Sequence, residues 1–302
     1  MRSLCLAGAT SVCLIACTVS PADESSVTQH AESHNRLASN RLASNRLASN
    51  RLASNRLASN RLASNRLASN ALTAEILESE EGRDVYSYII GCALPDGVTI
   101  EADVPGAEDT LPDAPYTCVN EHCTFYGNLG LAPRWIDHKL DRKGQRWVSA
   151  CLFARVNALD TAESISMRGR HEGLAVSQAE AELYTLEEGA FYGNLFIDDP
   201  DENVPPDWFA CRGEDKAASP NQAGLAARKC ADEDPANPGF TYCGFYYTGD
   251  CGDFTPQIPS PFACRTFNAL QGIYGDCYDE AGFGTWPGAR KYREVITVYA
   301  SN

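Results

Sequence analysis

The sequence has few methionines and histidines, few basic residues, and no long apolar run beyond its first residues. Its 302 residues include two Met and five His, and the only extended apolar segment covers residues 4–16. A protein that crosses a membrane several times needs several runs of about 20 apolar residues, so that class is excluded. Lys and Arg number 25 against 40 Asp and Glu, a formal charge of −15. Nucleic acid is therefore excluded as a partner, because phosphate binding needs a basic surface.

Familiar catalytic and metal-binding motifs are also missing. The chain has no G-x-S-x-G, no H-E-x-x-H and no phosphate loop. It has no Cys-x-x-Cys pair, which disfavours structural zinc. The sequence thus favours a protein without catalysis, although it leaves an enzyme open. Glu187 and Glu188, or other acids, could supply the two carboxylates of a glycoside hydrolase.

The chain begins with the features of an export signal. Arg2 precedes the apolar segment, which is too short to span a bilayer and ends in Leu14-Ile15-Ala16-Cys17. That tetrapeptide resembles the lipobox of bacterial lipoproteins. We expect residues 1–16 to be a lipoprotein signal peptide and Cys17 to be acylated, with the protein in the cell envelope as an outer-membrane lipoprotein or at the cell surface. The alternative is an ordinary signal peptide cleaved at a small residue.

Seven copies of Asn-Arg-Leu-Ala-Ser follow at residues 35–69. A period of five gives no continuous apolar stripe on a helix and alternates Leu between the faces of a strand. We expect residues 17–70 to be a disordered, lipid-anchored tether, with marginal helix or a short β-coil as alternatives. The repeats carry seven Arg and no acid, whereas residues 71–302 carry 17 basic and 37 acidic residues.

The remaining chain predicts a mixed fold. Residues 144–158 have helical apolar spacing, with Asp141 as the N-cap. Strands are expected at residues 85–92, 163–168, 240–248 and 294–300, and at residues 98–100 as a hairpin partner of the first. The fold class is therefore α+β, with mainly antiparallel strands, at least one helix and disulfide bonds. We expect an α+β lobe at residues 71–203 and a Cys-rich, loop-dominated lobe at residues 204–302.

Cysteine is the most informative residue of this region. Ten cysteines follow Cys17: Cys92, Cys118, Cys123, Cys151, Cys211, Cys230, Cys243, Cys251, Cys264 and Cys277. An even number in an exported chain indicates five disulfide bonds. Spacing does not determine the pairing, and the neighbour pairs Cys118–Cys123 and Cys264–Cys277 are guesses.

Two groups of residues are candidate ligand sites. Phe-Tyr-Gly-Asn-Leu occurs at residues 125–129 and 191–195, and Tyr126, Tyr192 and Trp135 could stack on sugar rings, although strand aromatics are more often core. Asp199, Asp201 and Asn203 alternate like calcium ligands, but the rest of an EF-hand loop is missing, and a solvated linker between lobes is the simpler interpretation. No other cofactor is expected.

Motifs along nearly the whole chain resemble a group of exported lipoproteins of myxobacterial type, some of which are labelled ADYC-domain proteins. The resemblance implies an outer-surface location and no known reaction or ligand. The segments that carry it, besides the repeat tether, are Gly91-Cys92-Ala93-Leu94-Pro95, Gly130-Leu131-Ala132-Pro133-Arg134-Trp135, Trp147-Val148-Ser149-Ala150-Cys151, Ser166-Met167-Arg168-Gly169, Glu188-Gly189-Ala190-Phe191-Tyr192-Gly193-Asn194 and Ala210-Cys211-Arg212-Gly213.

Three functional hypotheses remain. The first is a lipid-anchored, non-catalytic surface protein that binds a surface glycan or protein, or shields the envelope. The second is a secreted hydrolase acting on polysaccharide or peptide. The third is a disulfide-rich protease inhibitor, for which residues 256–261 could provide a rigid exposed loop.

Overall fold

The fold was analysed in a computed structural model. The structure describes residue 67 and residues 76–110, 114–159, 163–196, 207–252, 263–264, 267–279 and 290–302. These all belong to one compact unit, Asn35–Asn302. The signal peptide, the first six repeats, Cys17 and the 256–261 loop lie outside the described residues. None of the helices in the part described is long and apolar enough to cross a membrane.

The helices and strands alternate along the chain, as the α+β prediction requires. The helices are α5 (Glu80–Ala93), η1 (Pro133–Ile136), α6 (Arg142–Arg155), η2 (Glu172–Leu174), α7 (Gln178–Leu183), α8 (Glu214–Ala218) and α9 (Ala223–Ala226). The strands are β1 (Thr99–Asp103), β2 (Tyr116–Val119), β3 (His122–Tyr126), β4 (Ile165–Arg168), β5 (Tyr184–Asn194), β6 (Asp207–Arg212), β7 (Tyr246–Asp250), β8 (Phe267–Asn268), β9 (Ile273–Tyr274), β10 (Cys277–Tyr278), β11 (Lys291–Tyr292) and β12 (Val295–Ser301). The α+β class with mainly antiparallel strands is confirmed.

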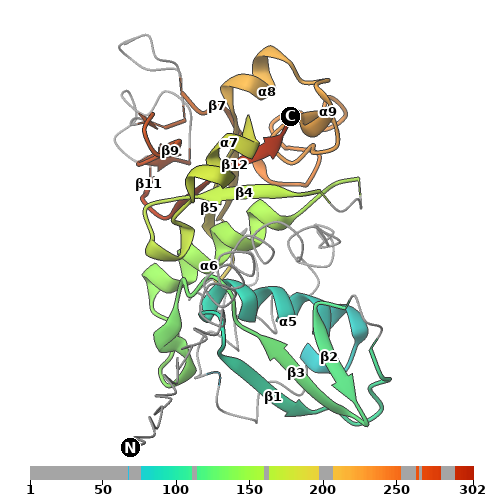
Figure 1. The fold of residues 1–302 in the computed structure, drawn as a ribbon. Coiled ribbons are helices and arrows are strands. Elements are labelled where there is room, and N and C mark those ends of the chain that lie inside the picture. The colour runs from blue at the N-terminus through green and yellow to red at the C-terminus, as the bar shows by residue number, and fades with distance from the viewer. Residues whose placement is uncertain are drawn as a thin grey trace, which may run out of the picture. The chain divides into compact units, whose positions relative to one another are not determined.

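A five-stranded sheet in the order β4-β12-β5-β6-β7 forms the centre of the fold (Figure 1). All of its strand pairs are antiparallel except β6 and β7. The sheet takes β4 and β5 from the expected lobe at residues 71–203 and β6, β7 and β12 from the one at residues 204–302. The two expected lobes therefore share one sheet, and β5 pairs directly with β6 across the expected boundary.

Helix α6 packs against this sheet and follows the sequence prediction. The side chain of Asp141 accepts a hydrogen bond from the Gly144 N–H at 2.7 Å and so satisfies a donor that the first turn leaves open. Val148, Leu152 and Phe153 are fully buried, because this face of the helix lies against β5 and β12. The predicted helix and its cap are both confirmed.

The strand predicted at residues 85–92 is instead part of helix α5. Ser79 caps the helix by accepting a hydrogen bond from the Gly82 N–H, and Glu80 and Glu81 lie in the first turn, where they favour its positive end. The prediction was wrong because it used the β-branched and aromatic composition alone. The helix is buried from Val85 to Ala93, so its apolar side chains find contacts on all sides and intrinsic strand propensity does not decide the outcome.

A smaller sheet in the order β1-β3-β2 packs its inner face on α5 (Figure 1). β2 and β3 form a tight hairpin whose two loop residues, Asn120 and Glu121, have φ of 51° and 64°. Both positive values fit the type I′ turn that matches strand twist. The strand expected at residues 98–100 exists as β1, but its partner is β3 and not residues 85–92.

The other strand predictions hold to different extents. Residues 163–168 contain β4 and residues 294–300 contain most of β12, so both strands are confirmed. Within residues 240–248, only the last residues belong to a strand, β7. The two Phe-Tyr-Gly-Asn-Leu segments do lie at strand ends, of β3 and β5. Each glycine permits close approach of backbone, since an added Cβ would lie 2.3 Å from the Pro95 oxygen at Gly127 and 1.8 Å from the Asp207 oxygen at Gly193.

Five disulfide bonds join all ten cysteines that follow Cys17. The pairs are Cys92–Cys151, Cys118–Cys123, Cys211–Cys251, Cys230–Cys243 and Cys264–Cys277. The prediction of five bridges is confirmed, and both guessed neighbour pairs are present. Four of the cysteines pair before residue 204 and six after it, so no bridge links the two expected lobes.

One residue of the expected tether belongs to the core. Leu67, in the seventh repeat, is 1 % exposed and lies in the large hydrophobic cluster of the body. The boundary predicted at residue 70 is therefore too late at this point, because a repeat leucine that meets an apolar surface is stabilised by burial like any other.

Candidate functional site

The structure does not bring the predicted aromatic platform together. Trp135 is 1 % exposed and packs edge-on against Phe196, while Tyr192 is fully buried and its hydroxyl donates to the Tyr278 carbonyl oxygen at 2.6 Å. Two of the three rings are thus core side chains that no sugar can reach. Tyr126 is the exception: it is half-buried on the small sheet, and its hydroxyl donates to Thr117 Oγ1 at 2.9 Å.

Glu187 and Glu188 contact opposite faces of the central sheet. The register of β5 against β12 shifts here: Val298 is paired with Gly189 and Tyr299 with Glu187, which leaves Glu188 as the extra residue of a β-bulge. Adjacent carboxylates that contact different faces cannot flank one glycosidic bond, so these two do not form the catalytic pair of a glycoside hydrolase.

Glu187 lies in a buried polar cluster beneath β9. Its Oε1 accepts a hydrogen bond from the Tyr274 hydroxyl at 2.8 Å, and Tyr299 lies alongside with the Arg168 guanidinium 3.7 Å from its ring centroid. Burial raises the pKa of Glu187 to about 7, and the Tyr274 hydrogen bond offsets only part of this effect. The carboxyl is 4 % exposed, so it is a proton-holding group inside the fold.

Glu188 is part of a buried network of charges on the other face. Its Oε2 pairs with the Arg228 guanidinium, which also donates to the Ala154 carbonyl oxygen of α6 at 2.9 Å. Lys216 is fully buried, donates to the Arg228 carbonyl oxygen at 2.6 Å and pairs with Asp232 at 3.1 Å. These contacts fix the β6–β7 connection against α6. Because each buried charge has an opposite charge beside it, removal of one partner would be strongly destabilising.

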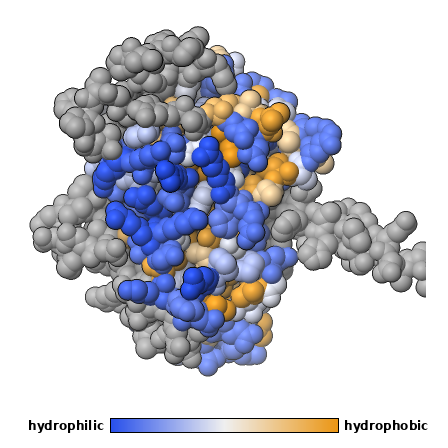
Figure 2. Space-filling model, turned by 90° about the vertical axis from the view of Figure 1, so that its left-hand side faces the viewer, coloured by the Kyte–Doolittle hydropathy of each residue, from blue (hydrophilic) through white to orange (hydrophobic). Residues whose placement is uncertain are grey.

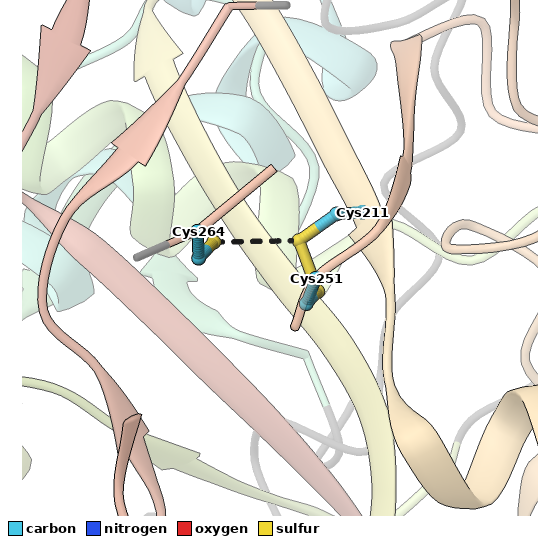
Figure 3. Close-up of side chains that lie close together, drawn as sticks. All are labelled: Cys211, Cys251 and Cys264. Carbon is cyan, nitrogen blue, oxygen red and sulfur yellow. Dashed lines mark hydrogen bonds between the residues drawn. A yellow bond between two sulfur atoms is a disulfide. The ribbon is translucent and has the colours of Figure 1, made fainter. Parts of the chain in front are cut away.

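The sulfur atoms of two disulfide bonds meet behind β6. Cys211 Sγ lies 3.7 Å from Cys264 Sγ, and Cys251 Sγ is within 4.8 Å of both (Figure 3). The spacing would suit three thiolate ligands of a metal ion. In the structure, however, Cys211 is bonded to Cys251 and Cys264 to Cys277. A sulfur in a disulfide is not a thiolate, so this cluster is not a metal centre in the oxidised protein.

The small sheet offers the most accessible polar surface among the described elements. Its burial alternates, so that Phe125 and its neighbours face α5 while the other side is open. We call this side the open face. It consists of Thr99, Glu101, Asp103, Thr117, Val119, His122, Thr124 and Tyr126.

One edge of the open face is acidic. His122 Nδ1 lies 2.9 Å from Asp103 Oδ1 and its Nε2 lies 3.7 Å from Glu101 Oε2. The hydrogen bond to Asp103 raises the pKa of His122, and Glu101 acts in the same direction. Towards Tyr126 the face carries hydroxyl groups instead. The open face can therefore donate and accept hydrogen bonds around one aromatic ring.

The sequence predicted only Tyr126 of this face. The missed signal is the alternation of polar and apolar residues on both sides of Asn120-Glu121, which indicates a hairpin with one solvated side. Figure 2 shows another property of the surface: on the face drawn, hydrophilic residues predominate and apolar ones form small groups. The large apolar side chains exposed in the described part belong to separate segments: Val119, Leu159, Leu183, Tyr242 and Leu270.

The calcium ligands proposed from the sequence, Asp199, Asp201 and Asn203, lie outside the described residues. Comparison of the chain with models of protein families, with curated proteins and with solved structures found no match. The chemistry of the described residues is therefore the basis of the functional interpretation.

Glu187 gives the fold a specific pH dependence. Its pKa is about 7 in the folded protein and 4.5 for an unperturbed carboxyl, so the folded state holds the proton more tightly. This contribution to stability is complete below pH 4.5 and is lost as the pH rises to 7, by about 3 kcal/mol. Glu187→Gln should remove this part of the slope in urea unfolding between pH 4.5 and 7.5. The exposed Glu182→Gln is the matched control, and equal slopes for both variants would contradict the assignment.

The sulfur cluster predicts a rearrangement when one bridge is opened. In Cys277→Ala the Cys264 thiolate is left 3.7 Å from Cys211 Sγ. It can attack that sulfur, form Cys211–Cys264 and release the Cys251 thiolate, so one thiol is present before and after. Alkylation and non-reducing peptide mapping should find the label shared between Cys264 and Cys251.

The control for this experiment is Cys123→Ala. Within the described part, Cys118 belongs to no such group of three sulfurs, so the label should stay on Cys118. If Cys277→Ala is labelled only at Cys264, the two disulfides do not exchange.

Proposed function

We propose that the protein is an exported, lipid-anchored binding protein of the cell envelope, and that its open face recognises a surface glycan. Lipidation at Cys17, the leader at residues 1–16 and the kinship with myxobacterial envelope lipoproteins are parts of the same proposal. The open face is the observation that carries the binding function, and the five disulfide bonds support the location.

Disulfide bonds support export because they persist in oxidising compartments and are rare in the reducing cytosol. Here the ten cysteines of the body are all paired. Each bridge contributes about 2–4 kcal/mol by restricting the unfolded chain. A fold held in this way suits a protein that works outside the cell.

Glycan recognition fits the chemistry of the open face. A sugar presents hydroxyl groups at its edge and C–H groups on its flat side. Tyr126 offers a ring that is not fully buried, Thr117 and Thr124 offer hydroxyls, and Glu101 and Asp103 offer acceptors for sugar hydroxyls. The acidic edge also disfavours anionic polymers, so we infer a neutral or amino-bearing glycan.

The hydrolase remains the second candidate, and one observation favours it. Burial sets the pKa of Glu187 near the range that a general acid needs. Its side chain is only 4 % exposed and is hydrogen-bonded to Tyr274, and Glu188 contacts the other face. Release of soluble sugar or peptide that Glu187→Gln abolishes would establish this function in place of the first.

Binding to envelope polysaccharide tests the proposal directly. The full chain should be retained on polysaccharide prepared from the envelope of its native cell, and Tyr126→Ala should weaken retention by at least about tenfold, since one stacked aromatic ring contributes about 1–2 kcal/mol and its loss also exposes the hydroxyls. Tyr242→Ala is the matched control, because Tyr242 is an exposed tyrosine on the β6–β7 connection, outside the open face.

Both variants should keep the melting temperature of the parent, which separates a lost contact from a damaged fold. Equal retention of Tyr126→Ala and Tyr242→Ala would show that the open face does not bind the glycan.

A further inference from the structure

The body holds the seventh repeat by two contacts. The Leu67 side chain is 1 % exposed and lies in the large core cluster, and its N–H donates to the Trp135 carbonyl oxygen at 3.0 Å. Trp135 is buried in η1 and its position is fixed by its own packing. The anchor point of the repeat is therefore a rigid part of the fold. We call the place that Leu67 occupies the leucine site.

Neither contact identifies the seventh repeat. The leucine site contacts a leucine side chain and a backbone N–H, and every one of the seven repeats offers both. The residues on either side, Arg66 and Ala68, also have identical counterparts in the other six copies. Local chemistry at the leucine site thus gives no preference for Leu67 over Leu62 or an earlier repeat leucine.

We propose that the leucine site is a docking site for the Asn-Arg-Leu-Ala-Ser unit and that any of the seven repeats of the same chain can occupy it. A shift by one repeat moves five residues from the N-terminal side of the site to the segment that leads into α5. The occupied repeat then sets how much chain separates the body from its N-terminal end, in steps of five residues.

Chain connectivity sets the order of preference. Leu67 is nine residues from Ile76, the first described residue of the following segment, whereas Leu62 is 14 residues away. Loop closure becomes less favourable with the 3/2 power of loop length, so this change lowers the population by about a factor of two. The seventh repeat is preferred, and the sixth is its closest competitor.

The proposal gives the identity of the repeats a physical meaning. Gain or loss of a whole repeat leaves a leucine at the same distance from α5, so the length of the chain ahead of the body can vary while the core contact is kept. This inference depends on neither the glycan nor the lipid anchor, and it stands or falls separately from the proposed function.

Melting temperatures of the purified full chain test the exchange of repeats. Leu67→Ser should lower the melting temperature by less than about 2 °C, because Leu62 takes the vacated place at a twofold cost. Serine at all seven repeat leucines should lower it by about 5–15 °C, the usual effect of losing a buried leucine in a body of this size.

The matched control keeps Leu67 and replaces the other repeat leucines with serine: Leu37, Leu42, Leu47, Leu52, Leu57 and Leu62. It should melt within about 2 °C of the parent. If Leu67→Ser alone melts as low as the sevenfold variant, the site is specific to Leu67 and the proposal is overturned.

Limited trypsin digestion gives a second readout that does not need the sevenfold variant to fold. Trypsin cuts after the Arg of each repeat, and the docked repeat should protect its own Arg–Leu bond. The resistant body should begin chiefly at Leu62 in the parent and at Leu57 in Leu67→Ser, a shift of five residues. Cleavage after Arg66 in Leu67→Ser would instead mean that no other repeat docks.

Protein concentration distinguishes the two possible sources of the leucine. The melting temperature of Leu67→Ser should be independent of concentration, because the repeat comes from the same chain. A rise with concentration would place a repeat of a second copy in the site and overturn the intrachain assignment.

Discussion

The body depends on covalent cross-links between elements that share few other contacts. Cys92–Cys151 joins α5 to α6, and Cys118–Cys123 closes the hairpin beneath the open face. Cys211–Cys251 fastens β6 to the residue after β7, and Cys230–Cys243 closes the long connection between those strands. The open face, the sulfur cluster and the edge of the central sheet all keep their geometry because these bridges restrict the chain around them.

β5 organises the polar interior between these cross-links. Its bulge turns Glu187 to the tyrosines under β9 and leaves Glu188 against Arg228 and α6. One shift of register thus separates two like charges that would repel each other on the same face. The result is a buried acid with a raised pKa on one side and a paired charge on the other. Both roles follow from packing, so the perturbed pKa alone does not make Glu187 catalytic.

The sequence predicted the features that depend on local chemistry or on counting. The N-cap at Asp141 and the five bridges of ten cysteines are of this kind. It failed for α5, since burial on all sides is a tertiary property that the composition of residues 85–92 does not contain. It also missed the partners of Glu187, because Tyr274 is 87 residues away in the chain. The burial of Leu67 could not be distinguished from that of six identical leucines.

The central claim is that this chain leaves the reducing cytosol and functions in the oxidised, anchored state. Mass spectrometry of the protein from its native cells, digested without reduction, tests this claim most directly. The account predicts an acylated N-terminal Cys17 and the five linked peptide pairs beginning with Cys92–Cys151. A chain that still begins at Met1 and takes up alkylating reagent at all its cysteines would contradict it.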